Sequence, residues 1–261
     1  MTQLRLTQVD AFADRPFAGN PAAVVPLEEW LPDETLQAIA LENNLSETAF
    51  TIPANDGEAD YELRWFTPAV EVVLCGHATL ASGHVLIGDR ERVRFRTRKA
   101  GLLEVARDGE GYAMTLPAYS PEPKPLPRVL AALGTGGQET FWHPGRYALI
   151  VYGSEADVLA LAPDFRKLAA EGDILTICTA PGSTTDVVSR VFAAGAGIDE
   201  DPVTGSAHSV LTPYWASRLG RDSFSAYQAS KRGGHIACRL AGDRVVLGGK
   251  CVTVLEGVLT L

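Results

Sequence analysis

Residues Arg64-Trp65-Phe66-Thr67, followed by Gly76-His77-Ala78, set a pattern that the second half of the chain repeats. There, Arg190-Val191-Phe192-Ala193 is followed by Gly205-Ser206-Ala207. The step from position 64 to 190 is 126 residues and the step from 76 to 205 is 129, close to half of the 261-residue chain. Two copies are too few for a solenoid, so the repeat predicts two domains of similar build.

Each half combines strand-like alternation with one apolar helix that is rich in small residues. These helices are predicted at Gly76–Ile87 and Gly205–Leu219, and both should be buried on most sides. Pro213 lies inside the second helix and predicts either a kink or a late start. Strands and helices do not alternate regularly, which favours an α+β fold over a doubly wound parallel sheet.

Five prolines between Pro117 and Pro127 mark the expected domain boundary. We expect an N-terminal domain of residues 1–118, completed by a last strand at about 250–261. The C-terminal domain should then span residues 119–249, with the active-site cleft between the two domains.

The composition excludes several classes of protein. Hydrophobic residues make up 46% of the chain and charged residues 21%, as in a globular protein with a substantial core. With 23 Lys and Arg against 32 Asp and Glu, the net charge of −9 argues against nucleic-acid binding. The four cysteines form no C-x-x-C pair, and the sequence shows neither a secretory signal nor an apolar stretch typical of a membrane span. We therefore expect a cytoplasmic protein.

Polar residues gather around the two predicted helix starts. A helix N-terminus presents unpaired N–H groups, and a glycine there lets an anion approach the backbone. Glu47 lies between a predicted helix and a strand, and Asp201 precedes the second apolar helix. A carboxylate held against apolar strands can act as a general acid or base. The alternative is that each is an ordinary turn or cap residue.

Other catalytic arrangements are less well supported. Ser206, His208 and Asp201 include the residue types of a hydrolase triad, but the sequence lacks the G-x-S-x-G elbow. Ser206 and His208 lie two positions apart on a helix and should point to different faces. The same objection applies to Cys75 with His77, so Cys75 is expected to be a packing residue. We expect no compact His/Cys/carboxylate cluster and no metal site.

Four motifs in this order resemble those of the PhzF family, the phenazine-biosynthesis-like proteins, and they span most of the chain. They are Asp10-Ala11-Phe12 with Phe17–Val24, then Asn44–Phe50, then Arg64–Pro68 with Leu74–Thr79, and finally Asp201–His208.

The resemblance implies a fold similar to that of diaminopimelate epimerase. That fold has two pseudo-symmetric domains, each a strand-rich β-barrel around a central helix. The resemblance also assigns the central acid/base role to Glu47, assisted by His77, Asp201 and Ser206. The residues expected to bind the substrate are Asn20, Ser46, Gly76, Thr204 and Gly205.

The implied reaction is a proton shift of the kind that isomerises trans-2,3-dihydro-3-hydroxyanthranilate, without a metal or organic cofactor. We expect a small carboxylate-bearing substrate and a homodimer. An epimerase or tautomerase acting on an amino-acid-like substrate is the alternative, although Asp201-Pro202-Val203 offers no second thiol to match Cys75. The second alternative is a metabolite-binding or interaction protein that catalyses no reaction.

Overall fold

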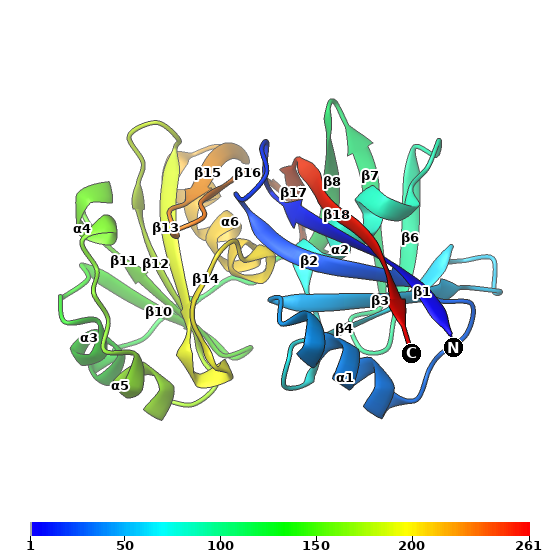
Figure 1. Cartoon of the computed structure of the whole chain (residues 1–261). Helices are drawn as coiled ribbons and strands as arrows, with labels where there is room; N and C mark the ends of the chain where they lie inside the picture. Colours follow the sequence, from blue (N-terminus) through cyan, green and yellow to red (C-terminus); the bar gives the residue numbers. More distant parts are fainter. Residues whose placement is uncertain (1) are drawn as a thin grey trace. The chain divides into compact units, whose positions relative to one another are not determined.

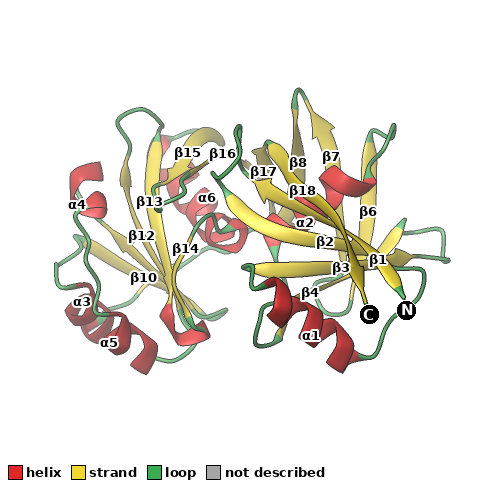
Figure 2. Ribbon diagram, viewed as in Figure 1, coloured by secondary structure: helices red, strands yellow, loops and turns green. Residues whose placement is uncertain are grey.

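The computed structural model describes residues 2–261, which divide into two compact units (Figure 1). Unit 1 runs to Leu116 and takes up the chain again at Gly248–Leu261, whereas unit 2 consists of Pro117–Leu247. Both units are rich in strands, so the predicted α+β class is confirmed (Figure 2). Among residues 2–261 there is no helix long and apolar enough to cross a membrane.

Unit 1 is a sheet with the strand order β18–β1–β2–β3–β4–β6–β7–β8. The pairs β2–β3 and β4–β6 are parallel, and the other pairs in this order are antiparallel. The elements are β1 Gln3–Ala11, β2 Asn20–Pro26, α1 Asp33–Asn43, β3 Glu47–Pro53, β4 Tyr61–Phe66, β5 Glu71–Val72, α2 Gly76–Leu86, β6 Arg92–Thr97, β7 Leu102–Asp108, β8 Gly111–Pro117 and β18 Cys251–Thr260.

Helix α2 is the centre of unit 1. It contacts β1, β2, β3, β6, β7 and β18, so strands from across the sheet enclose it. Its first eight residues, from Gly76 to Gly83, are all buried. Small side chains permit this close approach, since a Cβ added at Gly83 would overlap the side chain of Val105 on β7. The prediction of a helix buried on most sides is confirmed here.

Unit 2 has the strand order β9–β10–β11–β12–β13–β15–β16. Its parallel pairs are β11–β12 and β13–β15, and its central helix α6 contacts β11 and β16. The elements are β9 Glu122–Pro123, α3 Pro127–Leu133, β10 Glu139–His143, β11 Tyr147–Val151, α4 Glu155–Leu159, α5 Phe165–Ala170, β12 Leu175–Pro181, β13 Val187–Ala193, the 3₁₀ helix η1 Ala194–Ala196, β14 Ile198–Asp201, α6 Gly205–Leu219, β15 Ser223–Gln228, β16 Gly234–Ala241 and β17 Arg244–Gly249.

The repeat in the sequence corresponds to a repeat in the strand pairing. Unit 1 has a parallel, an antiparallel and a parallel pair in the order β2–β3–β4–β6, and unit 2 has the same series in β11–β12–β13–β15. In each unit a short strand, β5 or β14, then leads to the central helix. The three-residue helix η1 lengthens the loop before β14, which explains why the offset grows from 126 to 129.

One expectation from the sequence needs correction. Helix α6 begins at Gly205 and continues through Pro213, so a late start is wrong. The buried start of the helix fixes its first turn, and the proline is accommodated inside it. The proline-rich segment contains β9, and its last proline, Pro127, opens helix α3.

Candidate active site

The acid/base candidates of unit 1 meet at the start of α2. Glu47 is the first residue of β3, and His77 is the second residue of α2. His77 Nε2 lies 3.0 Å from Glu47 Oε2, and the two side chains are 5% and 12% exposed. The N–H does not point straight at the oxygen, so the contact is an ion pair rather than an aligned hydrogen bond.

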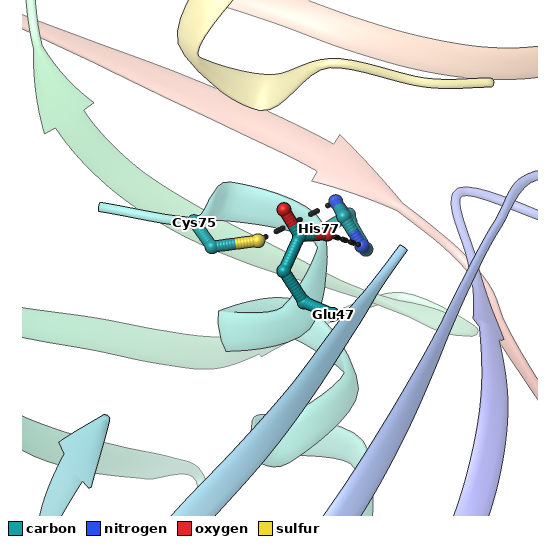
Figure 3. Close-up of side chains that lie close together, drawn as sticks. All are labelled: Glu47, Cys75 and His77. Carbon is teal, nitrogen blue, oxygen red and sulfur yellow. Dashed lines mark hydrogen bonds and ion pairs between the residues drawn. The ribbon is translucent and has the colours of Figure 1, made fainter. Parts of the chain in front are cut away.

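The other ring nitrogen of His77 has two neighbours. Asn20 Nδ2 lies 3.1 Å from His77 Nδ1. Cys75 Sγ lies 3.5 Å from the same atom, and Figure 3 shows the Cys75, His77 and Glu47 side chains together. An Asn amide can offer either its nitrogen or its oxygen. Asn20 is therefore able to satisfy Nδ1 whether that nitrogen is bare or protonated.

The contact between Cys75 and His77 corrects the spacing argument made from the sequence. That argument assumed that both residues lie on the helix. Cys75 is instead the N-cap, with extended backbone angles (φ −137°, ψ 111°), and its side chain turns toward the ring. Cys75, His77 and Glu47 therefore form a compact cluster, and the expectation that the chain lacks one is wrong.

Burial and charge set the protonation of this cluster. Burial, with the Glu47 charge adding to it, raises the pKa of the Cys75 thiol to about 11, so the thiol keeps its proton near neutral pH. Burial alone would lower the pKa of His77, but the interactions of its ring with Cys75 and Glu47 outweigh burial and raise the pKa well above its usual value. Because Cys75 is protonated at neutral pH, Glu47 is the partner that stabilises an imidazolium at His77.

The cluster contains the donor types that zinc prefers, and its three donor atoms lie within 4.8 Å of one another. Their arrangement favours a relay over a metal site, however. Cys75 contacts Nδ1 and Glu47 contacts Nε2, whereas an imidazole offers a metal ion only one nitrogen at a time.

In unit 2 the candidates surround the start of α6. Asp201 ends β14 and is 9% exposed, and Thr204 is the N-cap of α6. The Thr204 hydroxyl donates to Asp201 Oδ2. Gln228, which is fully buried, accepts from the Thr204 N–H at 2.9 Å and donates to the Asp201 carbonyl at 2.7 Å. Gln228 thus fixes the turn between β14 and α6, a role that the sequence did not indicate.

Ser206 and His208 have separate partners in unit 2. Ser206 is half-buried and hydrogen-bonds Tyr147 on β11. His208 Nδ1 donates to the Thr204 carbonyl at 2.8 Å, and burial lowers the pKa of His208 to about 4. Because the two side chains turn to different partners, their geometry is not that of a hydrolase triad.

The structure thus brings some predicted residues together and leaves others apart. Asn20, Glu47 and His77 meet in unit 1, and Asp201 meets Thr204 in unit 2. Gly76 and Gly205 open the two central helices. Ser46 directly precedes Glu47 and is half-buried, but it is not among the side chains that meet at His77.

The sequence matches the family model of the phenazine biosynthesis-like proteins over residues 9–257. The chain belongs to the PhzF family. It is 50% identical over 264 residues to an uncharacterized isomerase of Pseudomonas aeruginosa, a match that covers 99% of this chain and 100% of that protein. An uncharacterized isomerase of Halalkalibacterium halodurans is 43% identical over 261 residues, covering 97% of each chain.

Solved structures give the same family and the predicted fold. A PhzF-family protein of Enterococcus faecalis superposes with a TM-score of 0.92 at 44% identity, and the match covers both chains completely. A hydroxyproline epimerase of Agrobacterium vitis has a TM-score of 0.63 at 14% identity, covering 98% of this chain and 92% of that one. The second match shows that this fold also occurs in an epimerase, and the predicted diaminopimelate-epimerase-like fold class is confirmed.

Proposed function

We propose that this PhzF-family protein is a cofactor-free isomerase that moves a proton within a small carboxylate-bearing metabolite, with Glu47 as the acid/base. The observation that supports this assignment is the buried contact of 3.0 Å between Glu47 Oε2 and His77 Nε2. A carboxylate held in contact with a buried imidazole is the kind of positioned side chain that transfers a proton as a general acid or base.

The proposed reaction needs no net oxidation or reduction. The Glu47 carboxylate removes a proton from a substrate carbon, and the electron pair of that C–H bond delocalises toward an adjacent unsaturated or carbonyl group. The protonated Glu47 then delivers a proton to another carbon of the delocalised anion, which moves the double bond, and exchange of the Glu47 proton with water brings solvent deuterium into the product. His77 offsets the charge of Glu47 before and after the transfer, and Asn20 holds the His77 ring.

We assign the anionic parts of the substrate to the two helix starts. The first N–H groups of α2 and α6 have no partners within their helices, and the glycines at Gly76 and Gly205 allow a carboxylate or oxyanion to approach them. Asp201 would orient the substrate and Ser206 would donate a hydrogen bond to it. Ser46 and Thr204 complete the proposed binding residues. We also propose a cytoplasmic homodimer as the working form.

The test is proton exchange in deuterated water. Wild-type protein is incubated with trans-2,3-dihydro-3-hydroxyanthranilate and with a panel of cyclic and amino-acid carboxylates, and deuterium in the substrate carbon is measured by NMR. Glu47→Gln should abolish both deuterium uptake and double-bond movement while the carboxylates still bind. Glu42→Gln is the control, because Glu42 is an exposed carboxylate on the neighbouring helix α1.

Two results would contradict the assignment. Turnover that survives Glu47→Gln would remove Glu47 from the reaction. Carboxylates that bind to the wild-type protein but are neither exchanged nor converted would favour a metabolite-binding protein instead.

One contact also favours an epimerase as a second candidate. Cys75 Sγ lies 3.5 Å from His77 Nδ1, so the cluster contains a second group that is able to exchange a proton. An epimerase would invert a stereocentre, whereas the isomerase moves a double bond. Chiral analysis of the same deuterated products separates the two.

A further inference from the structure

In each unit an arginine, buried in the case of Arg64 and half-buried in the case of Arg190, binds a glutamate that lies five residues before the central helix. In unit 1, Arg64 Nε and Nη2 donate to the two oxygens of Glu71 at 2.7 and 2.9 Å. In unit 2, Arg190 Nε and Nη2 donate to the two oxygens of Glu200 at 2.7 and 3.0 Å. Both contacts are bidentate, the arrangement that fixes position and orientation together.

The two arginines are held in similar surroundings. Their side chains are 2% and 14% exposed. Each guanidinium stacks on the phenylalanine two positions later on the same strand face, at 4.9 Å for Phe66 and 5.1 Å for Phe192. Arg190 Nη1 also donates to the Leu161 carbonyl at 2.7 Å. Because each guanidinium is packed against a phenylalanine ring of the core, its position is fixed, and the glutamate bound to it is held in place.

The glutamates lie on the short strands that lead into the candidate site. Glu71 is in β5, which is two residues long and ends three residues before Cys75. Glu200 is in β14, which is four residues long and ends at Asp201 itself. Strands this short have few ladder hydrogen bonds, so a bidentate ion pair contributes a large part of what fixes them.

We propose that Arg64–Glu71 and Arg190–Glu200 are matched positioning pairs, each of which fixes the helix-start turn of its own unit. Arg64–Glu71 sets where the Cys75–His77 turn meets Glu47, and Arg190–Glu200 acts together with Gln228 to set the place of Asp201. Neither pair exchanges a proton with the substrate. The catalytic purpose of this positioning rests on the proposed function, but the ordering of each helix-start turn by its ion pair does not depend on that function.

Hydrogen exchange of two backbone amides tests the pairs without any substrate. The Thr79 N–H donates to the Cys75 carbonyl at 3.2 Å, and the Thr204 N–H donates to Gln228 Oε1 at 2.9 Å, so each amide reports on one turn. Glu71→Gln should speed exchange at Thr79, and Glu200→Gln should speed it at Thr204, each by at least about tenfold because local opening becomes easier. Exchange elsewhere in the same unit should stay within about twofold.

Two controls separate positioning from the loss of any arginine–carboxylate ion pair. Asp33→Asn removes the negative charge 2.8 Å from Nη1 of the same Arg64 but leaves Glu71 bound. Glu171→Gln removes a 2.8 Å contact to Arg128, and Glu171 is 17% exposed compared with 21% for Glu200. Neither control should change exchange at the two reporter amides.

Three outcomes would overturn the proposal: unchanged exchange at the reporters, a uniform rise across a whole unit, or an equal effect of the controls. If a glutamine variant fails to fold, Arg64→Lys and Arg190→Lys replace it, because lysine keeps the positive charge but cannot make the bidentate contact. These variants should still speed exchange at the reporter amides by about threefold. Where turnover is found, the glutamine variants should lower kcat and leave KM within about twofold. A protein without turnover would contradict the proposed function but leave the exchange test intact.

Discussion

The starts of α2 and α6 occupy the same place in two similar units, yet their chemistry differs. The 129-residue offset places Cys75 opposite Thr204 and His77 opposite Ser206. In unit 1 the N-cap and first turn contact ionisable groups, including the Glu47 carboxylate. In unit 2 the matching N-cap makes hydrogen bonds to Asp201 and to a neutral amide. A duplicated scaffold has kept the helix start and exchanged the groups around it.

This difference suggests a division of labour. Unit 1 contains adjacent groups whose protonation is coupled, which is what proton transfer requires. At the matching place in unit 2 lies the Asp201 carboxylate, whose position is fixed by Thr204 and by the buried Gln228. We therefore expect proton transfer to depend more on the cluster of unit 1 than on Asp201.

The sharpest test compares Glu47→Gln with Asp201→Asn. Loss of the proton carrier should lower kcat about 10³-fold or more, within the range found for general acid–base catalysis. Loss of a fixed charge that only orients the substrate should cost about 10²-fold or less. Solvent-deuterium uptake measures both variants on the same substrate. A larger loss with Asp201→Asn would reverse the assignment of the two units.

The two buried histidines should respond to pH in opposite directions. Because the folded-state pKa of His208 is about 4 and the unfolded value about 6.5, only the unfolded chain takes up a proton between these values. Stability from neutral His208 is therefore complete above pH 6.5 and falls by about 3 kcal/mol as the pH drops to 4. His77, whose pKa is raised, contributes its stability below pH 6.5 and loses it as the pH rises through the folded value.

Urea unfolding of the wild-type protein and of His208→Gln between pH 7 and pH 4 measures the effect in unit 2. The difference between the two proteins should shrink toward acid pH, because only the wild-type protein pays for keeping His208 neutral. Parallel stability curves would show that His208 is not protected from protonation. The corresponding His77→Gln comparison should change instead at alkaline pH.

The sequence predicted features that depend on local pattern. The range Gly205–Leu219 was predicted for α6 and is confirmed, because an apolar run there is bounded by glycines at both ends. The half-length repeat likewise indicated two similar units, since an arginine, a phenylalanine and a helix-start glycine occur in the same order in each half of the chain.

Features that depend on tertiary contacts were missed. Gln228 lies on β15, 24 residues from Thr204, and no local pattern marks it as the group that fixes the α6 turn. Cys75 was predicted to be a packing residue because it was assumed to lie on the helix with His77, whereas its backbone is extended. Element boundaries thus decide which spacing rule holds, and the N-cap is the position where a one-residue error changes the outcome.

Thr204→Val tests the fixed framework of unit 2. Valine keeps the shape of threonine but leaves Asp201 without its hydroxyl donor and Gln228 Nε2 without an acceptor at 3.1 Å. We expect the free energy of unfolding to fall by about 2 kcal/mol, because two buried hydrogen bonds of the hydroxyl are lost. Thr204→Ser, which retains the hydroxyl, should lose much less. Equal losses would place the effect in the methyl group and its packing.

The smallest effect is expected from Cys75→Ser, which tests whether unit 1 has one proton carrier or two. The Cys75 thiol has a pKa of about 11 and is protonated at neutral pH, so it cannot serve as a base without help. Serine is close in size and still presents a hydroxyl to His77 Nδ1. Turnover should therefore stay within about threefold of the wild-type rate if Glu47 alone carries the proton. A loss comparable to that of Glu47→Gln would identify a second proton carrier, and inversion of a stereocentre by the wild-type protein would then favour the epimerase reaction.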